Sequence, residues 1–123
     1  FNSPLMLGFE QFERTLDRIG KLPADVFALD WRLPLGTART RLGIGGPGDR
    51  RAVQGNLDPM VLFGPVTELE RRVRNILADA PRRGHVFNLG HGILPETPVP
   101  HVQALVEMVH RLGAAARSAG DSA

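Results

Sequence analysis

The sequence predicts an α/β fold, built from a parallel sheet with helices between its strands. Three short apolar runs, at residues 25–30, 52–57 and 85–89, are each five or six residues long. Short apolar runs are typical of strands that are buried on both faces, as in a parallel sheet. Each run is followed by a stretch with helical features, and strands that alternate with helices indicate right-handed crossover connections.

The first two expected helices lie on either side of the first strand. Near residues 5–20, apolar side chains recur at spacings of three and four, which places them on one helical face. The members of this face are Phe9, Phe12, Leu16 and Ile19. Gly20 and Pro23 are typical of a helix end. A shorter helix is expected from about Leu35 to Leu42.

The other two helices follow the second and third strands. One is expected to start near Thr67, where Glu70 completes the spacing of a capping box. Its apolar stripe comprises Leu69, Val73, Ile76 and Leu77. The other opens near Thr97-Pro98. Its apolar face comprises Val102, Leu105, Val106, Val109 and Leu112. Residues 114–123 are expected to form a flexible tail.

Length and composition narrow the class of protein. The 123 residues suffice for one small domain with a core. The chain begins at Phe1 rather than Met, so a segment is expected to have been removed or never included. Residues 1–123 are expected to be a single partial domain, since three βα units cannot close a barrel, which takes ~250 residues for eight units. The net charge is only +2, without the clustered basic residues of a nucleic-acid surface. The absence of Cys excludes disulfides and thiolate metal sites. Neither a membrane span of ~20 apolar residues nor a signal peptide is evident, so a soluble cytoplasmic protein is expected.

Polar residues follow each predicted strand at its carboxyl end, where active sites of parallel α/β folds form. The candidates are Asp30, Asn56, Asp58, Asn88 and His91. His91 is the strongest, because Gly90 and Gly92 leave its imidazole unshielded and let the backbone approach a ligand closely. Such an imidazole can exchange a proton near neutral pH or hydrogen-bond a carboxylate. For the Asp and Asn residues, the alternative interpretation is that they cap turns. His85 and His91 have no third ligand nearby, so no metal site is expected.

The same strand ends resemble those of the uroporphyrinogen decarboxylases. Residues 52–59, AVQGNLDP, resemble the VQGNLDP segment of that family, and residues 86–93, VFNLGHGI, resemble its IFNLGHG segment. Residues 29–31, LDW, resemble the family's LDW strand end. Three further matching residues are Pro95, Thr97 and Pro98. The resemblance extends over about residues 12–112.

The resemblance implies a TIM (β/α)8 barrel, of which this chain would supply the last three βα units. It also implies a carboxy-lyase that converts uroporphyrinogen III to coproporphyrinogen III by turning four acetate side chains into methyls, in porphyrin and haem biosynthesis. The implied mechanism protonates a pyrrole ring carbon and uses no cofactor or metal. His91 is thereby implied to contact a carboxylate of the tetrapyrrole substrate. Members of the family are typically cytoplasmic homodimers.

Much of the family's site has no counterpart in this sequence. The N-terminal Arg-rich motif and the pyrrole-binding Asp are missing, and the chain contains no Tyr, so the chain alone is expected to be inactive. One alternative is a zinc-dependent methyltransferase of the same superfamily, which has a zinc-binding Cys where this chain has His91. The other is a non-catalytic truncated product, whose open sheet edges would favour aggregation or a tight oligomer.

Overall fold

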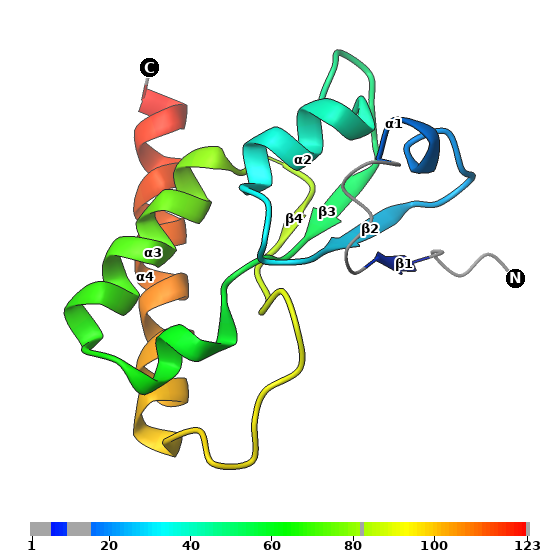
Figure 1. The fold of residues 1–123 in the computed structure, drawn as a ribbon. Helices are drawn as coiled ribbons and strands as arrows, with labels where there is room; N and C mark the ends of the chain where they lie inside the picture. The colour runs from blue at the N-terminus through cyan, green and yellow to red at the C-terminus, as the bar shows by residue number, and fades with distance from the viewer. Residues whose placement is uncertain (1–5, 10–15, 82, 123) are drawn as a thin grey trace, which may run out of the picture.

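One parallel sheet organises the chain. The structure, a computed structural model, describes residues 6–9, 16–81 and 83–122. Within these ranges the strands are β1 (Met6–Phe9), β2 (Val26–Leu29), β3 (Ala52–Gln54) and β4 (His85–Val86), and they lie side by side in this order (Figure 1). All neighbouring pairs are parallel, so each connection crosses from one end of the sheet to the other. The parallel α/β arrangement predicted from the sequence is confirmed.

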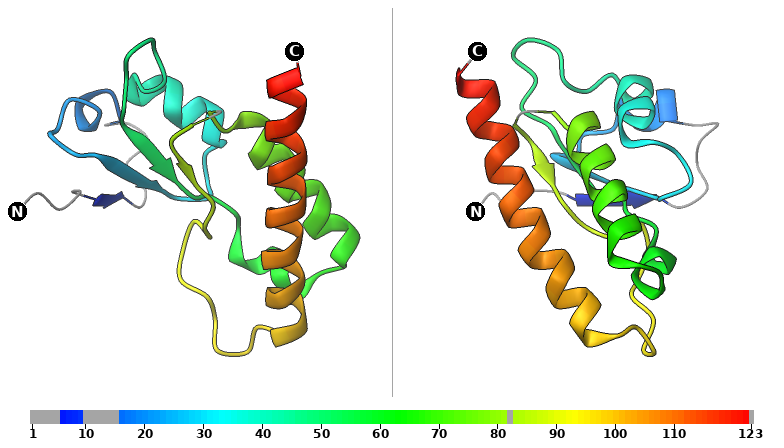
Figure 2. Two further views of the ribbon diagram at one scale, coloured as in Figure 1. Left: turned by 180° about the vertical axis from the view of Figure 1, so that it is seen from behind. Right: turned by 90° about the vertical axis from the view of Figure 1, so that its left-hand side faces the viewer.

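Helices occupy the connections between the strands, and one more helix follows the last strand. Their bounds are α1 (Leu16–Ile19), α2 (Leu35–Leu42), the 3-10 helix η2 (Pro59–Phe63), α3 (Val66–Asp79) and α4 (Val99–Ser122). The long helices α3 and α4 run side by side, whereas α1 and α2 lie near β2 (Figures 1 and 2). Among the helices described, none is both long enough and apolar enough to cross a membrane.

Two apolar clusters hold the helices against one face of the sheet. In the first, Phe27 of β2 and Val53 of β3 are fully buried among side chains of α1 and α2. In the second, η2, α3 and α4 pack together around Leu62, Leu69 and Val73. Side chains alternate between the two faces along a strand. The opposite face is less covered, and its residues Val26, Ala28, Gln54 and Val86 are half-buried or exposed.

The amino-terminal segment differs from the helix predicted near residues 5–20. Met6–Phe9 forms β1, which pairs along its whole length with Val26–Leu29, and the described helix is confined to Leu16–Ile19. Pairing gives the backbone of β1 hydrogen-bond partners on an existing strand. This tertiary contact overrides the helical spacing of the apolar residues. Phe12, which belonged to the predicted stripe, lies outside the described residues.

The predicted capping box is wrong. Helix α3 begins at Val66 with Pro65 as its N-cap, and no side chain caps it. Thr67 therefore lies inside the first turn, past the position from which a side chain caps the helix. The Glu70 carboxylate instead accepts a hydrogen bond of 3.1 Å from Arg111 on α4. The predicted stripe is confirmed by its buried members on α3, with the remaining two partly buried.

The last helix is longer than expected. Leu105 and Leu112 are buried as predicted, together with Met108, which the predicted face omitted. Val106, by contrast, is 51% exposed, so its assignment to the buried face is wrong. Helix continues through residues 114–122, where alanines favour it. The flexibility of residues 114–123 stays a prediction.

Candidate functional site

The carboxyl ends of β2, β3 and β4 lie at one edge of the sheet, because the three strands are parallel. We call the segments that follow them, residues 30–34, 55–58 and 87–98, the exit rim. Backbone hydrogen bonds continue across this rim: Leu57 N donates to Asn88 O over 3.1 Å, and Gly90 N donates to Leu57 O over 2.7 Å. The residues after β3 and after β4 therefore emerge side by side, as the sequence predicted.

The Asn56 side chain joins two segments of the exit rim, residues 55–58 and residues 30–34. Its side chain is buried, with 5% of the residue exposed, and its amide Nδ2 donates to Asp30 O over 3.0 Å and to Leu33 O over 2.6 Å. The preceding Gly55 has φ 135°, and a Cβ there would lie 2.8 Å from Leu29 O. A glycine at this position lets β3 approach β2 closely enough for the Asn56 amide to reach the loop.

Asp58 and Asn88 each accept a hydrogen bond from a backbone N–H that closely follows them on the exit rim. The Asp58 carboxylate accepts a hydrogen bond of 2.9 Å from Met60 N and so caps the start of η2. The exposed Asn88 side chain accepts a hydrogen bond of 2.8 Å from Leu89 N. The Asp58 contact is the turn-capping role of the alternative interpretation, whereas Asn88 bonds only the N–H of the next residue. Contact of either residue with a ligand stays a prediction.

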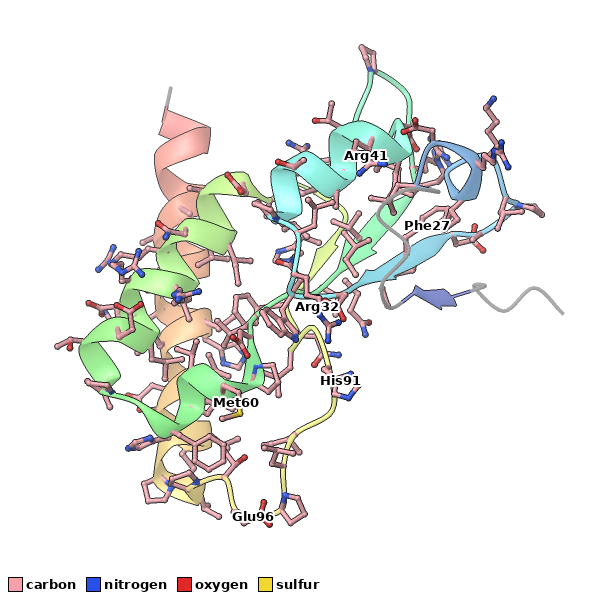
Figure 3. All side chains as sticks on the ribbon, viewed as in Figure 1. Phe27, Arg32, Arg41, Met60, His91 and Glu96 are labelled. Carbon is pink, nitrogen blue, oxygen red and sulfur yellow. The ribbon has the colours of Figure 1, made fainter. Side chains whose placement is uncertain are left out.

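His91 lies exposed on the exit rim, directly after a tightly packed glycine. Gly90 is buried, and a Cβ on it would lie 2.3 Å from Trp31 N and 2.8 Å from Trp31 Cα. No other residue fits there without moving the backbone. The segment that carries His91 therefore rests directly on the segment that follows β2, and His91 and Arg32 emerge at the same edge of the sheet (Figure 3).

Arg32 is a rim residue that the sequence analysis did not single out. Its NH1 donates to Asp30 Oδ2 over 2.7 Å, and its backbone N donates to Asp30 Oδ1 over 2.8 Å. Its guanidinium also stacks over the Trp31 ring, 5.0 Å from the ring centre. The sequence signal for Arg32 is its place two residues after the strand predicted at residues 25–30.

Two hollows adjoin the exit rim. One of about 260 Å³ lies between the segment after β2 and α3, with Trp31, Asn56 and Arg72 among its lining residues. The other, of about 280 Å³, lies between the segment after β4 and α4 and is lined mostly by apolar side chains, including Phe87 and Val106. The first borders the polar residues of the rim, whereas the second leaves apolar surface uncovered.

His85 lies on β4 rather than on the exit rim, and its side chain makes a structural contact with the first residue after β3. Its Nε2 lies 2.8 Å from Gly55 O, and burial lowers the pKa of its imidazole. A neutral ring with a proton on Nε2 satisfies both observations, because it donates to the carbonyl without a buried charge. Within the part of the chain that the structure describes, no three His, Asp or Glu side chains gather as metal ligands.

A comparison with models of known protein families shows to which family the chain belongs. Residues 6–112 match the family model described as uroporphyrinogen decarboxylase (URO-D). The chain belongs to the uroporphyrinogen decarboxylase family. The match covers β1 to most of α4, and so includes all three segments of the exit rim.

Curated relatives of the same family share about half of the aligned residues. The uroporphyrinogen decarboxylase of Rhodococcus opacus (strain B4) is 47% identical over 103 residues, which are 79% of this chain and 28% of the relative. That of Myxococcus xanthus (strain DK1622) is 53% identical over 94 residues, 76% of this chain and 26% of the relative. That of Geobacter sulfurreducens is 44% identical over 112 residues, 90% of this chain and 32% of the relative. The chain thus spans about a third or less of these uroporphyrinogen decarboxylases.

The chemistry available at the exit rim is that of anion binding. A histidine and an arginine lie there on segments that pack against each other through Gly90 and Trp31, and both can donate charge-assisted hydrogen bonds to a carboxylate. In this member of the uroporphyrinogen decarboxylase family, Asp30, Asn56 and Asp58 fix the turns around them through the bonds described above.

Proposed function

We propose that this chain forms the carboxyl-terminal βα units of a uroporphyrinogen decarboxylase. The observation that carries the proposal is the family match over residues 6–112. It is supported by the position of His91 and Asn56, which follow neighbouring parallel strands at one end of the sheet. Active sites of parallel βα folds form at that end.

The proposed fold of the whole enzyme is a (β/α)8 barrel. Eight βα units take about 250 residues, whereas this chain has 123. Among the described strands, β4 has a neighbour on one side only, and Val86 on it is 46% exposed. The apolar hollow beside α4 continues this open side. We propose that the first βα units of the barrel, which belong to the rest of the enzyme, close against it.

The proposed reaction converts uroporphyrinogen III to coproporphyrinogen III in porphyrin and haem biosynthesis, without a cofactor. A proton adds to a pyrrole ring carbon, and the ring accepts the electron pair of the carbon–carbon bond as the acetate carboxylate leaves as carbon dioxide. A proton then adds to the exocyclic carbon, and loss of the ring proton leaves a methyl group. The family resemblance supports a cytoplasmic homodimer as the working enzyme.

His91 is proposed to hold one carboxylate of the substrate. Its imidazole is exposed at the exit rim, and a protonated imidazole donates a charge-assisted hydrogen bond to a carboxylate. Asn88, exposed on the same segment, is proposed to line the cleft beside it. Asp30, Asn56 and Asp58 hold the surrounding turns, which keeps the two exposed side chains in place.

A chimeric enzyme tests the proposal. Residues 6–112 of this chain replace the matching segment of the Rhodococcus opacus relative, and turnover of uroporphyrinogen III is measured by product chromatography. The chimeric enzyme is expected to form coproporphyrinogen III, whereas the isolated 123-residue chain is expected to form none. His91→Ala should lower kcat/KM on the order of tenfold to a hundredfold, the loss expected for one charged hydrogen bond. Glu96→Gln, at an exposed position on the same segment, should leave it unchanged.

Three results would contradict the proposal. A folded chimeric enzyme without turnover would contradict the assigned reaction. A His91→Ala variant as active as its parent would contradict the role assigned to His91. Bound zinc at one equivalent per chain, with methyl transfer to a thiol in place of decarboxylation, would favour the methyltransferase alternative.

A further inference from the structure

We propose that Arg32 is a second carboxylate-binding residue of this site and acts beside His91. The inference deepens the proposed function and rests on it, since it assumes a substrate with several carboxylates. Three features of Arg32 carry it: a fixed orientation, an unused edge of the guanidinium, and a place next to the segment that bears His91.

The orientation of the Arg32 side chain is fixed before any ligand binds. Asp30 accepts one hydrogen bond from its NH1 at 2.7 Å and another from its backbone N at 2.8 Å. The Trp31 ring supports one face of the guanidinium at 5.0 Å. A flexible arginine loses rotamer freedom when it binds a ligand. Arg32 is already held by these contacts, so less of that loss falls on binding.

One edge of the Arg32 guanidinium remains available. Of its donors, NH1 is bound to Asp30, whereas Nε and NH2 donate to no acceptor among the residues described. The Arg32 side chain is 40% exposed, and that of Asp30 only 9%. The Asp30 carboxylate is therefore mostly covered, whereas part of the Arg32 side chain faces solvent. The Nε–NH2 edge matches the two oxygens of a carboxylate in a side-on, bidentate pair.

Arg32 and His91 are neighbours through the packing of their backbones. Gly90 lies against Trp31 so closely that a Cβ on it would be 2.7 Å from Trp31 Cβ. Arg32 directly follows Trp31 in the chain, and His91 directly follows Gly90. Both Arg32 and His91 emerge at one edge of the sheet (Figure 3). One imidazole binds one carboxylate, so a substrate with acidic groups around a ring needs further cations at the same rim.

The competing interpretation gives Arg32 a local role only, as the partner of Asp30 in the turn after β2. The two interpretations differ in what neutralising the side chain does. A local role affects the stability of the turn, whereas a ligand contact changes KM and the affinity for porphyrin carboxylates at unchanged stability.

The test uses the chimeric enzyme with Arg32→Gln, and Arg71→Gln as a matched control. Arg71 is also exposed and also paired with a carboxylate, that of Glu68, but lies on α3. Arg32→Gln should raise KM for uroporphyrinogen III on the order of tenfold, with kcat changed less than about twofold, because a charged hydrogen-bond pair is lost. The Kd for uroporphyrin, a non-reacting analogue, should rise equally. Arg71→Gln should leave both constants unchanged.

The outcomes separate this inference from the proposed function. If the parent chimera turns over and Arg32→Gln keeps the parental KM and Kd, Arg32 has only the local role and the inference fails alone. If the folded parent neither turns over nor binds uroporphyrin, both fail. Should Arg32→Gln not fold, Arg32→Lys serves instead. Lysine keeps the charge but not the bidentate edge, so an unaltered KM there also refutes the contact. Comparing coproporphyrin, which lacks the acetate carboxylates, shows which carboxylate Arg32 binds.

Discussion

Two aspartate–arginine pairs with the same spacing lie at opposite ends of the sheet. They differ in how many hydrogen bonds the guanidinium of the arginine donates. Asp49 and Arg51 precede β3, and Asp30 and Arg32 follow β2. In both pairs the aspartate accepts the backbone N–H of the arginine, over 2.9 Å and 2.8 Å respectively. In both, it also binds the guanidinium. The local geometry is therefore shared.

The partners beyond the aspartate distinguish the two arginines. Arg51 donates from NH1 to Gly20 O and from NH2 to Gly43 O, and it binds Asp49 through both Nε and NH2. The two carbonyls follow α1 and α2, so one guanidinium joins two helix ends to the start of β3. Among the residues described, the Arg32 guanidinium hydrogen-bonds only to Asp30 and stacks over the Trp31 ring. Arg51, whose guanidinium donates from all three nitrogens, holds the two helix ends in place. Arg32, which donates from NH1, is the one that we propose to bind a ligand.

A neutral amide performs the clamping at the exit rim. Asn56 bonds two carbonyls of the segment after β2, as Arg51 bonds two carbonyls at the opposite end. Because Asn56 holds this segment, Arg32 is not needed for that purpose. The comparison between the two ends therefore makes three predictions about stability, all measured on the chimeric enzyme.

The largest effect is expected for Asn56→Asp. This change places a buried carboxylate against the carbonyl oxygens of Asp30 and Leu33, which currently accept hydrogen bonds from Nδ2. A buried charge without a partner destabilises the folded state by about 3–5 kcal/mol. We expect a loss of this size in the free energy of unfolding, measured by urea denaturation. Asn75→Asp, at an exposed position on α3, makes the same chemical change and should have little effect. Equal losses for the two variants would refute the clamping role of Asn56.

The elements that the sequence predicted well are those set by neighbouring residues. The helix predicted from about Leu35 to Leu42 has these bounds in the structure, and Gly43 ends it with φ 74°, a left-handed conformation that glycine adopts readily. β1 was missed because its partner β2 lies further along the chain, and pairing between separate segments leaves no local periodicity. Thr67 and Glu70 had the spacing of a capping box, but Pro65 already starts the helix.

The candidate site shows the same division. The flanking glycines singled out His91, and the alternation of strands and helices placed it at one edge with Asn56. The contact of Gly90 with Trp31, and the hydrogen bonds from the Asn56 amide to the segment after β2, depend on how separate segments pack. The sequence therefore indicated where the site lies, but not which of its polar residues hold turns.

An intermediate effect is expected for Arg51→Gln. The substitution removes the charged partner of Asp49 and leaves the carbonyls of Gly20 and Gly43 without their donor. Hydrogen bonds to charged groups contribute about 1.5–3 kcal/mol each, so we expect a net loss of about 2 kcal/mol in the free energy of unfolding. Arg50→Gln, at the exposed neighbouring position, is the control. Arg32→Gln should lose less, about 1 kcal/mol, because it removes only the pair with Asp30 and leaves no helix-end carbonyl without its donor. If Arg32→Gln lowered the free energy of unfolding as much as Arg51→Gln, Arg32 would be a structural residue like Arg51 rather than a ligand contact.

The smallest effect concerns pH. Hydrogen bonds from the Arg51 side chain, and then from its backbone, lower the pKa of Asp49 from 3.8 to about 2. The unfolded chain therefore binds this proton more readily, and the stabilisation is complete above about pH 4 and lost as pH falls toward 2. We expect about 1 kcal/mol from Asp49, allowing for solvent screening. Glu68 has its pKa lowered to about 2 as well, so the parent is compared with Asp49→Asn, in which only the Asp49 contribution is gone. Urea denaturation at pH 5 and pH 3 should show the two free energies of unfolding converging at the lower pH. Parallel profiles would mean that Arg51 holds the helix ends without help from the Asp49 charge.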